Sequence, residues 1–261
     1  MSVSVGQYTA IDDTADASWF IRFSDSVNAI PEYRGVRATL IEQLGSLEGK
    51  HVLDVGCGPG DDTRELARLA GPSGRVVGVD LSESMLAEAR RRGGPVEFRR
   101  DDVYALSFPD ATFDRVRAKL VRQHLLDIDR ADDELVRVLR PGGRLAVFDL
   151  DLETLALDHP DRTATRAFQQ YWADHHKQGW CGRQMRRRFA ARGMTDVTTT
   201  PYTVHMPYEF FRQATRGALA DPEAATVLGM TPEEWWRPLA EAEEAGLFFA
   251  SLTGWVLGAT R

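Results

Sequence analysis

The sequence predicts an α/β fold in which helices cover both faces of a mostly parallel sheet. From His51 onward, short apolar stretches alternate with amphipathic helices, and this alternation is typical of βαβ units. A glycine-rich turn over residues 56–60 joins the first of these strands to its helix, where open α/β sheets bind ligands. With 261 residues and 43% hydrophobic content, the chain is long enough to bury a full core.

The first 45 residues are expected to be helical. Trp19, Phe23 and Val27 recur at helical spacing, and Pro31 ends this element. A second helix is expected over about residues 32–44, because Gly45 follows its last apolar residue. We interpret residues 1–45 as an N-terminal helical lid.

Residues 46–151 are expected to form the ligand-binding core. The break between its last helix and last strand is expected at Pro141-Gly142-Gly143. The expected strands are His51–Val55, Arg75–Val79, Val96–Arg99, Phe113–Ala118 and Arg144–Phe148, and the expected helices are Asp62–Ala70, Ser82–Arg92 and Asp132–Leu139.

Residues 152–261 are expected to supply the remaining strands of the same sheet, with helical insertions that cap the substrate. No low-complexity linker separates the two halves, so we predict one domain with a helical cap. The expected strands are Val197–His205 and Phe248–Ala259, and the expected helices are Thr163–Lys177, Gln184–Arg192, Tyr208–Leu219 and Pro232–Ala245.

The bulk composition argues against several classes of protein. A net charge of -7 and a pI near 5.4 disfavour nucleic acid as a partner, because phosphate backbones require basic surface. The absence of a run of about 18 apolar residues argues against a membrane partner. Cys57 and Cys181 stand in unrelated contexts, which disfavours both a disulfide scaffold and zinc. We expect a cytoplasmic protein with a small-molecule partner, and the sequence is compatible with a homodimer.

The glycine turn indicates a ligand that approaches the backbone closely. Gly56, Gly58 and Gly60 follow a G-x-G-x-G spacing, whereas a dinucleotide fingerprint would place glycine at Asp61. Asp61 and Asp62 at the start of the following helix oppose a pyrophosphate and suit a cationic ligand. A nicotinamide-dependent oxidoreductase is therefore the weaker alternative.

Two further acids follow the next strands. Asp80 stands about twenty residues beyond the glycines, where a carboxylate accepts both ribose hydroxyls, although a helix N-cap is the alternative. Met85 can pack on an adenine or belong to the core. Asp102 can accept the adenine amine while the Val103 N–H donates to a ring nitrogen. A shift of one residue, to Asp101, stays open.

Four motifs then resemble a known family as a set. They are Asp54-Val55-Gly56-Cys57-Gly58-Pro59-Gly60, Gly78-Val79-Asp80-Leu81-Ser82, Arg100-Asp101-Asp102-Val103 and Leu139-Arg140-Pro141-Gly142-Gly143. In this order and spacing, over roughly residues 35–150, the chain resembles class I S-adenosylmethionine-dependent methyltransferases of the type 11 group. That group includes ubiquinone and menaquinone biosynthesis enzymes and natural-product methyltransferases.

The resemblance implies a Rossmann-like, seven-stranded sheet whose last strand runs antiparallel beside the fifth. It also implies S-adenosyl-L-methionine as cofactor, with Asp54 and Gly56 at the methionine moiety, Asp80 at the ribose, and Asp102 with Val103 at the adenine. Lys119 falls where backbone contacts the cofactor in the family, and Arg37 is the candidate for the cofactor carboxylate. The expected cofactor-binding residues are Arg37, Asp54, Gly56, Cys57, Gly58, Gly60, Asp80, Leu81, Met85, Asp102, Val103 and Lys119.

The acceptor side rests on fewer residues. His124 lies where family members often carry a histidine, and it can act as a general base or simply hold its loop. Trp19, Tyr171, Trp172 and His176 can line an aromatic acceptor pocket or pack the cap. A metal site at Asp149, Asp151 and Asp158 near His159 is disfavoured, because no compact ligand spacing is present.

The expected reaction is methyl transfer to an O, N or C nucleophile of a small, partly apolar metabolite of secondary metabolism. The alternative within the same fold is a protein that binds the cofactor structurally and catalyses a cyclisation or rearrangement.

Overall fold

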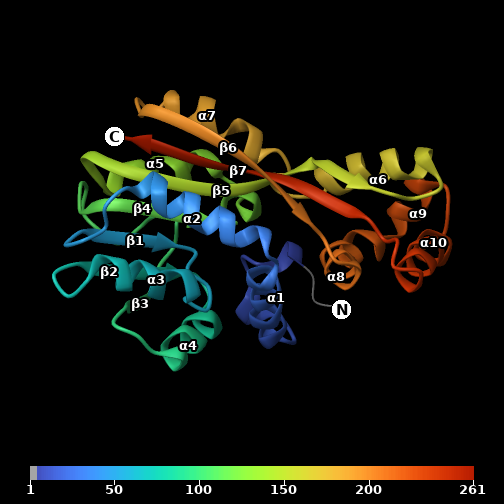
Figure 1. Cartoon of the computed structure of the whole chain (residues 1–261), viewed down its shortest axis with the longest axis horizontal. Helices are drawn as coiled ribbons and strands as arrows, with labels where there is room; N and C mark the ends of the chain where they lie inside the picture. Colours follow the sequence, from blue (N-terminus) through green and yellow to red (C-terminus); the bar gives the residue numbers. More distant parts are fainter. Residues whose placement is uncertain (1–4) are drawn as a thin grey trace.

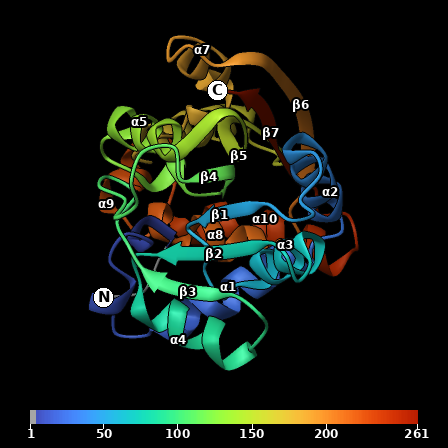
Figure 2. The same cartoon turned by 90° about the vertical axis from the view of Figure 1, so that its left-hand side faces the viewer.

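Seven strands form one sheet in the computed structural model, which describes residues 5–261. The strand order is β3-β2-β1-β4-β5-β7-β6 (Figure 2). Strands β1 to β5 are parallel, whereas β7 runs antiparallel between β5 and β6, which confirms the predicted sheet. The strands are β1 His51–Val55, β2 Arg75–Asp80, β3 Glu97–Arg100, β4 Phe113–Lys119, β5 Leu139–Leu157, β6 Thr195–His205 and β7 Ala250–Thr260.

Helices cover both faces of this sheet, because strand residues alternate between two apolar cores. Val52 and Val76 face the core that contains α2 and α3, whereas Leu53 and Val77 face the core that contains α5 and α7. The helices are α1 Ala17–Ala29, α2 Glu32–Leu44, α3 Asp61–Ala70, α4 Glu83–Arg92, α5 Ile128–Val138, α6 Arg162–Asp174, α7 Cys181–Ala190, α8 Tyr208–Leu219, α9 Pro222–Leu228 and α10 Pro232–Glu244, with short 3-10 turns η1 Val5–Gln7, η2 Ile11–Asp13 and η3 Arg122–His124.

Strand β5 is much longer than the five residues that the apolar pattern predicts. It pairs with β7 as far as Leu157, so the expected end at Phe148 is wrong. The pattern misleads because Asp149 and Asp151 look like surface acids, yet both are buried and paired with Arg122 and Arg183. The predicted break around Gly142 is a register shift within the β4–β5 pairing rather than a gap between two elements.

The cap contains one helix that the sequence analysis does not predict. The seven-residue α9 begins with the Asp221 side chain capping its first turn and ends at Gly229. A helix of two turns presents too little periodicity to be recognised. Helices α6, α8, α9 and α10 gather at one end of the molecule, around the far ends of β5 and β7 (Figure 1).

Helix α1 lies between the sheet core and this cap, whereas α2 packs on the sheet (Figure 1). Asp16 accepts a hydrogen bond from the Trp19 N–H and so caps α1 at its start. Helix α1 contacts α4 on one side, while η1 contacts α8 on the other (Figure 1). Residues 1–4 of the predicted N-terminal lid lie outside the described residues.

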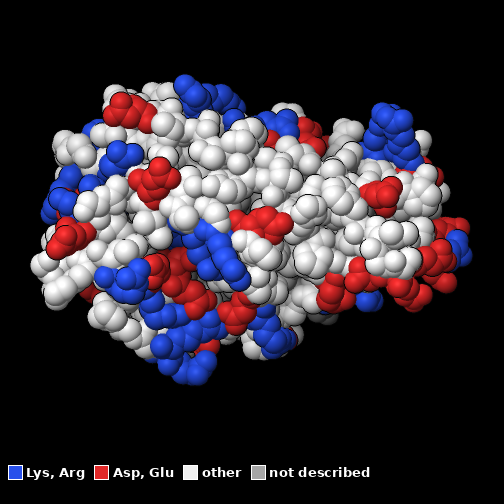
Figure 3. All heavy atoms as spheres, in the orientation of Figure 1, with Lys and Arg blue, Asp and Glu red and all other residues white. Residues whose placement is uncertain are grey.

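The charged surface and the helix lengths bear on possible partners. On the face in Figure 3, basic side chains lie among acidic ones rather than in one continuous patch. No helix within residues 5–261 is both long and apolar enough to cross a membrane. Over the same range, no three His, Cys, Asp or Glu side chains are grouped so that they could hold a metal ion.

Candidate active site

The glycine turn after β1 has a geometry that other residues cannot adopt at two of its positions. Gly56 and Gly60 have φ angles of +65° and +79°. A Cβ atom at Gly60 would lie 2.6 Å from the Phe98 ring, and one at Gly56 would overlap Val121. At Gly58, φ is +52° and nothing lies within 4 Å of the Cβ position. The turn is therefore packed on its outer sides and open at its centre.

Asp80 joins the glycine turn to helix α4. One carboxylate oxygen accepts the Gly58 N–H at 2.9 Å, and the other accepts the Ser82 N–H at 3.0 Å. Burial raises the pKa of this carboxyl, although the backbone donors oppose the rise. Ser82, whose hydroxyl accepts from the Met85 N–H, is the N-cap of α4. Asp80 is therefore free of the capping role and faces the cavity described below.

The two acids after β3 make different contacts within the protein. Asp101 accepts both the backbone N–H and the hydroxyl of Ser107, which holds the loop. Asp102 is exposed and accepts only a local bond from the Tyr104 N–H. Both acids line the cavity described below, but the Asp101 carboxylate is already engaged by Ser107 whereas Asp102 keeps free lone pairs.

One cavity of about 370 Å³ connects these groups with the cap. Its wall includes Gly56, Cys57, Gly58, Asp80, Leu81, Met85, Asp102, Val103, Lys119 and His124. Ten of the thirteen residues expected for cofactor binding and catalysis thus lie on a single surface. Met85 lines the cavity and also belongs to a small apolar cluster with Ile11 and Phe20. A place in the core and a contact with an adenine are therefore compatible.

Three of the residues expected for cofactor binding lie behind this wall: Asp54, Gly60 and Arg37. Asp54 is fully buried, where it accepts the Thr63 hydroxyl at 2.6 Å and pairs with Arg117 at 2.6 Å. Gly60 is the N-cap of α3. Arg37 lies 2.9 Å from Asp62 and donates to the Asn28 carbonyl at 3.1 Å.

Basic side chains balance the acids at the start of α3. Asp62 pairs with Arg117 and Lys119, both at 2.5 Å. Burial opposes ionisation, but these two cations hold the pKa of Asp62 well below its ordinary value. Burial lowers the pKa of Lys119 despite its contact with Asp62. Asp62 is therefore an ionised acid without free charge to offer a ligand.

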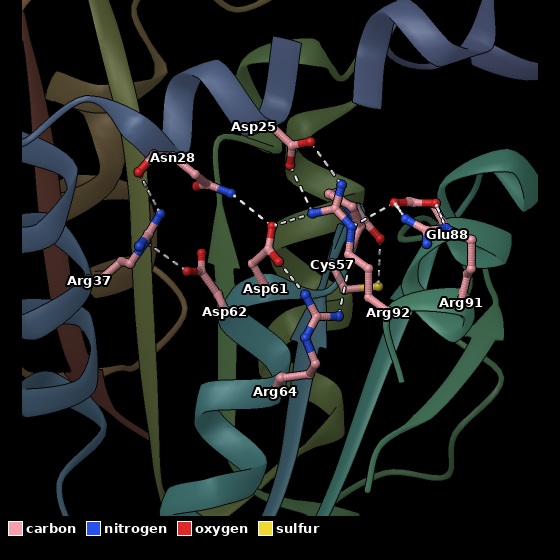
Figure 4. A network of polar contacts seen from close by, with 12 residues as sticks. Asp25, Asn28, Arg37, Cys57, Asp61, Asp62, Arg64, Glu88, Arg91 and Arg92 are labelled. Carbon is pink, nitrogen blue, oxygen red and sulfur yellow. Dashed lines mark hydrogen bonds and ion pairs between the residues drawn. The ribbon is translucent and has the colours of Figure 1, made fainter. Parts of the chain in front are cut away.

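Asp61 is balanced in the same way (Figure 4). It pairs with Arg64 and, at 2.9 Å, with Arg92, and it accepts the Asn28 amide at 3.3 Å. Asp61 and Asp62 thus line the cavity with charges that are already balanced by neighbouring cations, which weakens the attraction for a cationic ligand that the sequence suggests.

The far end of the cavity is mainly apolar. Phe23 and Val27 from α1, Leu150 and Leu152 from β5, and Phe210 from α8 line it. Trp172 and His176 also face this end, as the sequence suggests. Trp19 and Tyr171 lie one layer behind: Trp19 stacks on Phe23, and Tyr171 packs against His175.

His124 lies where the two ends of the cavity meet. Burial lowers its pKa to about 3, and the nearby His176 and Lys177 act in the same direction. Its Nε2 atom lies 3.1 Å from the Gln123 amide nitrogen. Its ring stacks on that of Tyr8, with centroids 4.7 Å apart and planes 28° apart.

Sequence reasoning missed several groups in the cavity wall, among them Tyr8, Asn28 and Arg117. Arg117 carried a usable signal, since an arginine between Val116 and Ala118 in a buried strand needs a buried acid. Tyr8 and Asn28 carried none, because their contacts are made with residues far along the chain.

The comparisons agree with this geometry. Residues 52–143 match the family model described as a methyltransferase domain. An uncharacterized 37.1 kDa protein in transposon TN4556 of Streptomyces fradiae is 34% identical over 250 residues, covering 91% of this chain and 70% of that protein. The ubiquinone/menaquinone biosynthesis C-methyltransferase of Hahella chejuensis is 41% identical over 120 residues, which cover 44% of this chain and 48% of that protein. The match therefore spans about half the length of that relative.

The fold comparison points the same way. The crystal structure of the YcgJ protein from Bacillus subtilis superposes with a TM-score of 0.61 at 21% identity, covering 87% of this chain and 99% of that one. The fold is that of a Rossmann-like α/β protein. Residues 52–143 form a methyltransferase domain of the S-adenosylmethionine-dependent kind, and its cofactor is S-adenosyl-L-methionine.

Proposed function

We propose that the protein transfers the methyl group of S-adenosylmethionine to an O, N or C nucleophile of a small, partly apolar metabolite of secondary metabolism. The observation that carries the proposal is the single cavity, which runs from Asp80 and Asp102 to an apolar end beside His124. A cofactor held at the polar end and an acceptor at the apolar end would meet next to this histidine.

The residues present fit the cofactor. Asp80 can accept the ribose hydroxyls with the lone pairs that its two backbone donors leave free. The open space at Gly58 lets a ligand approach the backbone of the turn. Bound S-adenosylmethionine supplies an activated methyl group on a sulfonium, so the protein's task is mainly alignment and exclusion of water.

His124 is the proposed general base. Because its pKa is about 3, the imidazole is neutral at pH 7 and can accept a hydrogen bond from the nucleophile. Such a weak base would take the proton as the new bond forms rather than beforehand. The aliphatic and aromatic wall beside it favours an acceptor with a ring or chain to bury.

The similarity to a quinone C-methyltransferase suggests which acceptors to test first. The protein would be incubated with methyl-labelled S-adenosylmethionine and a panel of quinols, phenols and aliphatic alcohols. Label appearing in an acceptor together with stoichiometric S-adenosylhomocysteine supports methyl transfer. His124→Asn should lower kcat by about 10²–10⁴-fold for an acceptor that must lose a proton.

The same assay separates the cyclisation alternative. If an acceptor is rearranged while S-adenosylmethionine is bound but never consumed, the cofactor has a structural role and the proposed transfer is wrong.

A further inference from the structure

The N-terminal segment, defined here as residues 8–29, forms one wall of the cavity. Tyr8, Ile11, Phe23, Val27 and Asn28 all line it. This segment therefore shares one cavity wall with the glycine turn and with cap residues such as Phe210.

Several polar contacts hold the segment to the sheet core. Asp12 accepts hydrogen bonds from the Ser82 hydroxyl and the Glu83 N–H, both at 2.7 Å. Arg92 makes a two-point contact with Asp25, at 2.8 and 2.9 Å, and also pairs with Asp61 (Figure 4).

A further contact reaches the cap. The Lys177 ammonium donates to the Thr9 hydroxyl at 2.6 Å. Partly exposed contacts of these kinds each contribute little to stability. The buried side chains of Ile11, Phe20, Phe23 and Val27 therefore hold the segment in place more than these polar contacts do.

Tyr8 is the residue that this segment brings to His124. Besides stacking on the imidazole, its hydroxyl lies 3.4 Å from the Ser24 hydroxyl on α1, and its ring packs edge-on against Phe20. The other titratable groups that affect the His124 pKa are His176 and Lys177, which both lie just after α6. Tyr8 thus supplies an apolar cover on the side that the segment closes.

We propose that Tyr8 is a positioning residue for methyl transfer, held against His124 by the packed N-terminal segment. The stack fixes the imidazole plane beside the acceptor end and shields the ring from water. The catalytic part of this inference rests on the proposed function, whereas the contact between the two rings does not.

Two substitutions at Tyr8 test the stack. Tyr8→Phe keeps the ring and loses only the hydroxyl, whereas Tyr8→Ala removes the cover. The histidine titrations would be followed by NMR in protein with labelled imidazole nitrogens, and His124→Asn would identify the His124 signal. In the wild type and in Tyr8→Phe we expect His124 to stay neutral down to pH 5.

In Tyr8→Ala the His124 pKa should rise towards its ordinary value near 6.5, since water reaches the ring. The kcat at pH 5.5 should then fall about tenfold relative to pH 7.5, because roughly one imidazole in eleven stays neutral at that pH. An unchanged His124 titration in Tyr8→Ala would overturn the proposal, because the stack would then shield nothing in solution.

A second pair of variants tests the attachment of the segment without altering Tyr8. Arg92→Gln breaks the contact with Asp25 on the segment, together with those to Asp61 and Glu88. Arg91→Gln removes the neighbouring, outward-facing arginine, which pairs with Glu88. We expect Arg92→Gln to raise the His124 pKa and Arg91→Gln to leave it unchanged. If the His124 pKa is the same in the two variants, the Arg92 contacts of the segment do not hold Tyr8 against His124.

The outcomes separate the two proposals. If no acceptor is methylated but Tyr8→Ala still shifts the His124 titration, the proposed function fails and the positioning contact stands. If methylation proceeds and its pH profile is identical in wild type and Tyr8→Ala, the positioning role fails and the proposed function stands.

Discussion

Asp80 shows how one side chain organises the cofactor end of the cavity. Its carboxylate accepts one backbone N–H from the glycine turn and one from the start of α4, so two loops from different strands are held together. The same two oxygens face the cavity, where they can accept a pair of hydroxyl groups. The structural role of Asp80 and its proposed role in binding the ribose would therefore coincide in one residue.

Asp80→Asn should lower cofactor affinity by about 10–100-fold, since the amide group can accept on one side only and loses the charge that strengthens the hydrogen bonds. Calorimetry with S-adenosylmethionine and S-adenosylhomocysteine would measure the change. Asp101→Asn is the control, because this acid holds the Ser107 loop. Equal affinity losses in both variants would contradict the role assigned to Asp80.

Strand β4 places a buried cation between two other elements. Arg117, fully buried on β4, pairs with Asp54 on β1 and Asp62 on α3. Burial lowers the pKa of the guanidinium, but the two carboxylates more than offset this effect and raise it. The arrangement ties the strand that precedes the glycine turn to the helix that follows it.

Arg117→Leu should destabilise the protein by about 3–5 kcal/mol, because it leaves the buried Asp54 carboxylate without its charged partner, while Asp62 keeps Lys119. The matched control is Arg115→Leu on the same strand, whose guanidinium donates only to the Asp114 carbonyl among the contacts found. We expect that change to cost less than about 1 kcal/mol in urea unfolding. Adding Asp54→Asn to Arg117→Leu should recover part of the loss; if it does not, the pairing is not the cause.

At the scale of the whole molecule, the cavity lies where three parts of the chain meet. The sheet edge provides the polar end, the cap provides apolar side chains such as Phe210, and the N-terminal segment closes the space between them. A ligand that fills this space contacts all three parts, so binding should stabilise them together.

Saturation with S-adenosylhomocysteine at about 100 times its Kd should stabilise the fold by about 2.7 kcal/mol. For a chain of this length, such a gain raises the melting temperature by roughly 5–10 °C. Thermal unfolding followed by fluorescence would test this, with NADH as the control ligand. A shift with NADH and none with S-adenosylhomocysteine would contradict the cofactor assignment.

Local pattern was enough to predict most of the fold and the polar end of the cavity. The spacing of Gly56, Gly58 and Gly60, and the acids Asp80 and Asp102 after successive strands, are features of short stretches. Parallel strands bring such stretches to one edge of the sheet without further information, so the cofactor end follows from order and spacing.

The tertiary structure decided which charges are free and what covers His124. Asp54, Asp61 and Asp149 read as available acids in the sequence, yet each is paired with an arginine from a distant element. Tyr8 reaches His124 only because η1 and α1 fold back over the cavity. The sequence by itself thus determined the sheet, the glycine turn and the cofactor class. Side-chain packing decided the length of β5, the balance of charge and the closure of the acceptor end. This packing joins elements far apart in the chain, so it produces no periodic pattern in the sequence.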